Sequence, residues 1–231
     1  MVKNNKNIVL RHYDDGTTSS LRSPTYYQVL HFYRKSDVLV QLTKTFCERF
    51  LPKYGDRTVD QMVQAARSIK QNIAEGCTDG QTSTEVELKL LGIARGSNQE
   101  LLEDYHDYIR HNNIAEWATC NKDRFDRLHE YSLSHSDLDD YMPFFHRWTD
   151  EEMANCTICL CHMVDKALCS FIAKVDHEFS TYGGTKERMT AARLEQRNNQ
   201  KEIIEQQQQE IMRLKAQVAS LQHKLAEKKD R

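Results

Sequence analysis

The chain has 231 residues, of which 39% are hydrophobic and 29% charged, with a formal net charge of −2. No apolar run approaches the roughly 20 residues that a membrane helix needs, so we expect no membrane-spanning segment. The first residues lack the apolar core of a secretory signal, which predicts a cytoplasmic protein whose 7 cysteines are reduced thiols.

Charge is distributed unevenly along the chain. Residues 185–231 hold 11 Lys and Arg against 7 Asp and Glu, a net charge of +4, which leaves −6 for residues 1–184. An acidic body with a basic tail makes the tail the better candidate for contact with a polyanion.

The expected elements begin with a polar arm over residues 1–22 and three helices at 24–51, 58–75 and 84–109. Only 3 Pro and 8 Gly interrupt the chain, and apolar residues recur at i, i+3 and i+4 within each helix. For the second helix this stripe comprises Met62, Ala65, Ala66, Ile69 and Ile73.

Individual residues mark helix ends and contacts. Gly76 stands where the second helix could end in the left-handed conformation, and Ser83 or Thr84 could cap the third. Gly92 and Gly96 share one face of the third helix, which predicts a close approach by another backbone.

Residues 111–150 break this pattern and are expected to form a helical insertion with short helices at 114–131 and 137–148. A fourth long helix should follow over 150–180, ended by two glycines at 183–184. Four long amphipathic helices with short connections predict an all-α protein, an antiparallel up-down four-helix bundle over 23–182 with a helical insertion before helix four.

Residues 183–231 form a hinge followed by a long polar helix. Ile or Val recurs every seven residues with Leu at the d position, which favours a parallel two-stranded coiled coil. The expected oligomerisation residues are Ile204, Ile211, Leu214, Val218, Leu221 and Leu225. The alternative is a tail helix that packs only inside an oligomer, or that frays.

Two sequence blocks, QAARSIKQNIAEG at 64–76 and LLGIARGSNQELLEDY at 90–105, resemble a family of small four-helix-bundle proteins. This family was first seen in intervening sequences of bacterial 23S ribosomal RNA genes and includes the accessory variability protein of diversity-generating retroelements. The segment FSTYGGTKERMTAAR at 179–193 is similar to a suffix found on a subset of these proteins.

The resemblance implies a ring-like homo-oligomer, commonly a pentamer, and a protein or reverse-transcriptase partner. It also implies nucleic-acid contact, as in the retroelement member, whose outer surface is basic. This chain departs from the family in its longer 111–150 insertion and in its acidic body.

Metal binding is the first chemical alternative. A group of thiols and one imidazole on the fourth helix has the ligand types that zinc prefers: Cys156, Cys159, Cys161, His162 and Cys169. Only the first two share a helix face and no second CxxC pair exists, which favours buried packing. One Glu103-x-x-His106 motif and one Asp126-x-x-His129 motif fall short of the set that a di-iron bundle requires.

For nucleic acid, the candidate contacts are cations of the second and third helices and of the tail: Arg67, Lys70, Arg95, Arg188, Arg193, Arg197 and Lys201. The alternative is that Arg67 pairs with an acidic neighbour such as Glu100 and that the tail cations are a solvated helix face.

No catalytic motif, phosphate loop or dinucleotide fingerprint is visible, so we expect neither an enzyme nor a cofactor. The sequence predicts a non-enzymatic, homo-oligomeric scaffold or adaptor that uses its C-terminal helix to dock a partner or itself. A nucleic-acid-binding accessory factor is the second hypothesis and a metal-binding bundle the third.

Overall fold

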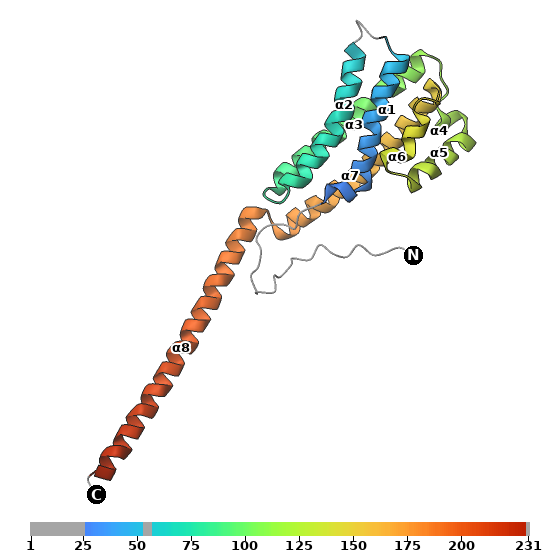
Figure 1. Cartoon of the computed structure of the whole chain (residues 1–231). Helices are drawn as coiled ribbons and strands as arrows, with labels where there is room; N and C mark the ends of the chain where they lie inside the picture. The colour runs from blue at the N-terminus through green and yellow to red at the C-terminus, as the bar shows by residue number, and fades with distance from the viewer. Residues whose placement is uncertain (1–25, 53–56, 230–231) are drawn as a thin grey trace.

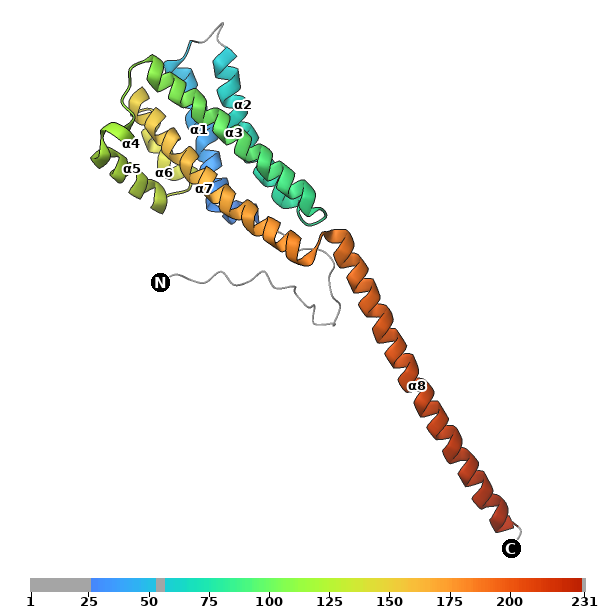
Figure 2. The ribbon, with the colours of Figure 1, turned by 180° about the vertical axis from the view of Figure 1, so that it is seen from behind.

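The computed structural model describes residues 26–52 and 57–229, and the polar arm expected at 1–22 lies outside these ranges. Every element in the described ranges is a helix, which confirms the all-α class. The body is built on α1 (His31–Phe50), α2 (Arg57–Asp79), α3 (Thr84–His111) and α7 (Asp150–Tyr182). Figures 1 and 2 show a final helix, α8 (Thr185–Lys229), leading away from this body.

The four helices of the body share one hydrophobic core. α2 packs against α1 and α3, and α7 packs against α3 and α1 on the other side. The predicted stripe of α2 is confirmed, since all five of its members are buried. All four helices contribute large side chains with almost no exposed surface to this core: Phe46, Leu39, Leu42, Met62, Ile69, Ile73, Leu91, Leu101, Tyr105, Met153 and Leu160.

The first helix begins later than predicted. A short 3-10 turn, Tyr27–Val29, precedes it, and Leu30 is extended with a ψ of 123°, so α1 starts at His31. Val29, inside the predicted range 24–51, lies before this backbone break and is 65% exposed.

Gly76 does not end the second helix, which continues to Asp79. It is buried instead at the approach of α2 to α3, where a Cβ atom would lie 3.3 Å from the Cβ of Leu90 and 3.4 Å from the carbonyl oxygen of Glu87. The property of Gly76 that this contact requires is therefore its missing side chain, not a left-handed conformation.

The close approach predicted for Gly92 and Gly96 is absent within this chain. A Cβ added at either glycine would meet no described atom within 4 Å, and both residues lie on the outer face of α3. Val86 and Ile93 have the seven-residue spacing of an apolar stripe, but they are 40% and 42% exposed. The buried side of α3 includes Leu91, Ala94, Asn98, Leu101 and Tyr105.

The insertion folds as four short elements rather than as two helices. These are α4 (Trp117–Cys120), α5 (Lys122–Ser134), α6 (Leu138–Tyr141) and the 3-10 turn η2 (Met142–Phe144). α5 packs on α7 and α6 packs on α1. Because the insertion covers the outer side of α7, every residue from Met153 to Cys161 is buried.

Hydrogen bonds from the long helices fix the insertion in place. The ammonium group of Lys35, on α1, donates to the carbonyl oxygens of Ser132 and His135 at the end of α5. On α7, Asn155 accepts from the backbone N–H of Trp117 at 2.8 Å and donates to the carbonyl of Ala115 at 3.0 Å. The insertion is thus part of the body rather than a loose loop.

The joint between α7 and α8 follows the expected glycines. Gly183 has a φ of 71°, and its N–H donates to the carbonyl of Phe179 at 2.9 Å, which ends α7. α8 starts at Thr185, directly after the two glycines, so the hinge before the tail helix is short.

One helical stretch meets the length and composition of a membrane span, in contrast to the expectation from sequence. Asp150–Gln222 contains an 18-residue window with a mean hydropathy of 1.5, and 44% of that window is buried inside the structure. The core helix of a soluble protein passes the same test.

Candidate functional site

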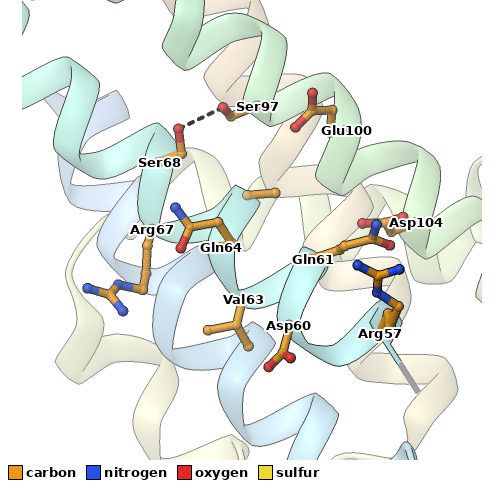
Figure 3. A pocket seen from close by; sticks show the side chains of 11 residues that line it. Arg57, Asp60, Gln61, Val63, Gln64, Arg67, Ser68, Ser97, Glu100 and Asp104 are labelled. Carbon is orange, nitrogen blue, oxygen red and sulfur yellow. Dashed lines mark hydrogen bonds between the residues drawn. The ribbon is translucent and has the colours of Figure 1, made fainter. Parts of the chain in front are cut away.

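A polar groove of about 830 Å³ lies between α2 and α3. Figure 3 shows side chains from both helices around it. The lining residues are Arg57, Asp60, Gln61, Val63, Gln64, Ala65, Arg67, Ser68, Ser97, Glu100 and Asp104. Arg57, Gln61, Gln64 and Ser68 follow one another by three or four positions, so a single face of α2 supplies them.

Small polar groups bring the two helices together in this groove. The hydroxyl groups of Ser68 and Ser97 lie 2.8 Å apart (Figure 3). The amide of Asn72 donates to the hydroxyl and the carbonyl of Ser68 at 3.0 Å and 2.9 Å. The partner that the polar Asn72 needs is therefore one turn earlier on its own helix, and Ser68 carries the contact across to α3.

The α3 side of the groove is acidic. Glu100 and Asp104 line it, and burial raises the pKa of Asp104, with further contributions from the charges of Asp107 and Glu100. The negative charges of Glu100 and Asp104 would repel a phosphate group on this side of the groove. The groove suits a neutral or mixed-charge polar partner.

The three cations predicted in the body face different neighbours. The ammonium of Lys70 pairs with Asp37 on α1 at 2.6 Å, and the guanidinium of Arg95 pairs with Asp165 on α7 at 2.8 Å. Arg67 lines the groove but points away from Glu100, so the pairing expected between them is not seen (Figure 3). The three side chains do not combine into one phosphate-binding face.

The tail cations lie on the first half of α8. Arg193, Arg197 and Lys201 are exposed, whereas Arg188 is half-buried close to the joint with α7. The three exposed cations are spaced four residues apart and therefore share one side of the helix.

The predicted coiled-coil residues are solvent-exposed within this single chain. The exposed fractions lie between 49% and 59% for Ile204, Ile211, Leu214, Val218 and Leu221. Leu225 belongs to α8, but its side chain is outside the described part of the structure. An apolar row left in water on a 45-residue helix is a surface that lacks a partner in the monomer.

The cysteines of α7 pack as core residues. Cys156, Cys159 and Cys161 are at most 2% exposed, and burial raises the pKa of each thiol, to about 11 for Cys159. Cys161 does not share the helix face of Cys156 and Cys159, yet it is buried as well, because α7 is covered on both sides at this level. In the described ranges, no group of three or more His, Cys, Asp or Glu residues is placed to hold a metal ion.

The groove between α2 and α3 was not predicted from the sequence. The polar row of α2 gave a signal, because four polar residues share one face, but a solvated face gives the same pattern. The placement of α3, with Ser97 and Glu100 opposite that row, makes it a groove.

Comparison with known proteins confirms the resemblance to a family. Residues 28–131 match the family described as 23S rRNA-intervening sequence protein, which is slightly less than half of the chain. The match includes α1, α2 and α3 and ends within α5, so it extends beyond residue 105, where the second motif block ends. No curated protein and no solved structure gave a significant match to the chain.

Proposed function

We propose that this protein is a non-enzymatic, homo-oligomeric scaffold whose body is an antiparallel up-down four-helix bundle. The contacts among α1, α2, α3 and α7 support this arrangement, as do the short connections between the first three helices. The all-helical fold and the match to the intervening-sequence family fit the same proposal. In this proposal the copies associate through α8. The assembly is a ring, such as the pentamer that the family resemblance implies, and it works in the bacterial cytoplasm.

The proposal rests on the heptad row of α8, the exposed apolar side chains that recur with heptad spacing: Ile204, Ile211, Leu214, Val218 and Leu221. Association of two or more copies would remove these side chains from water, at about 25 cal/mol per Å² of apolar surface. The outer face of α3 is a second apolar surface, since Val86 and Ile93 lie seven residues apart there and both are exposed. A ring needs more than one contact surface per copy, and these two faces supply them.

Light scattering on the full-length protein tests the proposal. Leu214→Glu places a charge in the predicted seam and should reduce the mass of the assembly. Met212→Glu is the matched control, because Met212 is 64% exposed and lies two residues away, outside the seam. A monomeric wild-type protein at micromolar concentration, or equal effects of the two variants, would contradict the role of α8.

A second function, nucleic-acid binding, has support only in α8. Arg193, Arg197 and Lys201 share an exposed side, whereas Lys70 and Arg95 are held in ion pairs within the body. Assembly through α8 would multiply this basic row and strengthen its binding to phosphates.

Fluorescence anisotropy with labelled RNA and single-stranded DNA at low salt tests this second function. The variant Arg193→Glu/Arg197→Glu should bind less tightly and show a smaller salt dependence than the wild type. Lys70→Glu, in the body, should leave binding unchanged. If neither nucleic acid binds the wild type at low salt, the second function is refuted.

The remaining features support a cytoplasmic, non-membrane protein within this proposal. None of the seven cysteines, all of which are in the described ranges, forms a disulfide, which fits a reducing compartment. The apolar window of α7 packs against α1 and α3, which fits a core helix better than a lipid-facing one.

A further inference from the structure

A second groove, of about 350 Å³, lies on the insertion and is rich in aromatic side chains. It is bounded by α4, α5, η2 and the start of α7. The lining residues are Trp117, Arg124, Arg127, Leu128, Tyr131, Phe144, Trp148 and Glu152. The α5 members follow at i, i+3, i+4 and i+7, so they present one continuous face of that helix.

The aromatic walls are held by contacts of their own. The rings of Phe144 and Trp148 are stacked, with centroids 5.1 Å apart, and the ring of Tyr131 meets Phe144 edge-on at 6.1 Å. On the other side, the indole N–H of Trp117 donates to Glu151 at 2.5 Å. A groove with fixed walls loses little conformational entropy when a partner binds.

The two arginines of the groove differ in their pairing. The guanidinium of Arg124 lies over the ring of Trp117 and pairs with Glu151 at 3.0 Å. Arg127 is exposed, and its Nε donates to the backbone carbonyl of Asp123 at 3.2 Å. No carboxylate in the described ranges pairs with Arg127, so its remaining N–H donors face solvent beside the aromatic walls.

The only acidic residue that lines the groove is already engaged. Glu152 accepts from the backbone N–H of Thr149 at 2.8 Å and from its hydroxyl at 3.2 Å, which completes the capping box of α7. It also lies in the first turn of a long helix, where the positive end of the helix dipole stabilises a carboxylate. The unmet charge in the groove is therefore positive.

We propose that this groove binds a short peptide segment of a partner protein in which an aromatic residue lies within three positions of an Asp or Glu. The aromatic side chain packs between Trp148 and Leu128, where it can stack or pack edge-on. The carboxylate pairs with the guanidinium of Arg127, whose N–H fork matches the two carboxylate oxygens.

Other classes of ligand fit less well. A nucleic acid needs several cations along one path, and this groove offers one unpaired guanidinium on a body whose net charge is −6. A cationic ligand held in an aromatic cage would meet Arg127 at close range and be repelled. The proposal goes beyond the scaffold function, and it holds whether or not the chain self-associates, because no α8 residue lines the groove.

Intrinsic fluorescence provides a direct measurement. The chain has 2 tryptophans, Trp117 and Trp148, and both line this groove. The probes are blocked pentapeptides with one Phe and one Asp separated by none, one or two alanines, so that only the protein emits on selective tryptophan excitation. We expect a saturable change in tryptophan emission below about 1 mM for at least one spacing.

Matched peptides and variants separate the proposal from nonspecific binding. Replacing the Asp of the binding peptide with Asn should weaken binding about tenfold, and Arg127→Glu should do the same to the protein. Arg147→Glu is the control, because Arg147 is exposed on the same insertion but does not line the groove. Far-ultraviolet circular dichroism checks that each variant is folded.

Three outcomes would overturn the proposal. The first is the absence of saturable binding by every peptide of the panel to the wild-type protein. The second is equal binding by the Asp and Asn peptides. The third is equal loss in Arg127→Glu and Arg147→Glu, which would show a general charge effect rather than a carboxylate site.

Discussion

The ammonium nitrogen of Lys35 lies 2.7 Å from the carbonyl oxygen of His135, a residue 100 positions later in the chain. Lys35 is only 6% exposed, and burial lowers its pKa. The charge is tolerated because the C-terminal end of α5 offers carbonyl oxygens and the negative end of a helix dipole. This contact joins the insertion to α1.

Lys35→Met should therefore loosen the insertion. The carbonyls of Ser132 and His135 would lose their donor in a buried place, and we expect the free energy of unfolding to fall by about 1–3 kcal/mol. Hydrogen exchange should become faster around the end of α5 while α2 and α3 remain protected. Lys44→Met, also on α1 but half-exposed, is the control; equal destabilisation by both changes would argue against this role of Lys35.

Thiol reactivity should divide the seven cysteines into three groups. Cys120 is exposed and should react first with a thiol reagent, and Cys169 is half-buried and should react more slowly. The other five are buried and should react only after unfolding. Mass spectrometry of labelled peptides checks the assignment, and Cys120→Ser should remove the fast phase. Fast labelling of Cys156 in the native protein would contradict the packing of α7.

Alkaline pH should destabilise the protein through its buried thiols. Burial raises the pKa of Cys159 from 9.0 to about 11, so above pH 9 the unfolded chain loses this proton while the folded chain keeps it. The stabilisation is complete below pH 9 and is lost as pH rises toward 11. The lowered pKa of Lys35 acts in the opposite direction. As pH rises, the buried Lys35 loses its proton more readily in the folded chain than in the unfolded chain, and this favours the folded state.

Cys159→Ala isolates the thiol in this pH dependence. Two pKa units correspond to roughly 2–3 kcal/mol, so the variant should lose less stability than the wild type between pH 9 and 11 by up to that amount. Urea unfolding in a series of buffers measures it. Parallel pH profiles for the two proteins would show that Cys159 does not carry the effect.

Two glycines should respond in opposite ways to an added side chain. Gly96→Ala meets open space and should stabilise α3 by up to about 1 kcal/mol, the difference in helix propensity. Gly76→Leu must displace Leu90 and the backbone of α3 and should destabilise by roughly 1–3 kcal/mol. Urea unfolding measures both.

The Gly96→Ala variant also tests the assembly. A smaller assembly mass in light scattering would place the outer face of α3 at a contact between copies.

Much of the fold could be predicted from local patterns. The apolar stripe of α2, the Ser83 cap of α3 and the stop at Gly183 were all expected and all are present. Such features follow from helical periodicity and from the conformations that single residues favour, so they require no knowledge of neighbouring elements. The two motif blocks likewise identified the family that residues 28–131 match.

Other features depended on tertiary contacts. The sequence gives no sign that Lys35 would meet the end of α5, or that the insertion would cover α7 and bury Cys161 with its neighbours. Gly76 and Gly96 look alike in the sequence, yet one faces α3 at contact distance and the other faces open space.

The chain alone therefore determined the long helices, the family resemblance and the heptad row of α8, because each is a matter of local spacing. Only the tertiary structure decided which charges are paired and where grooves form. Those depend on which side chains from distant segments meet, and periodicity within one helix carries no information about its neighbour.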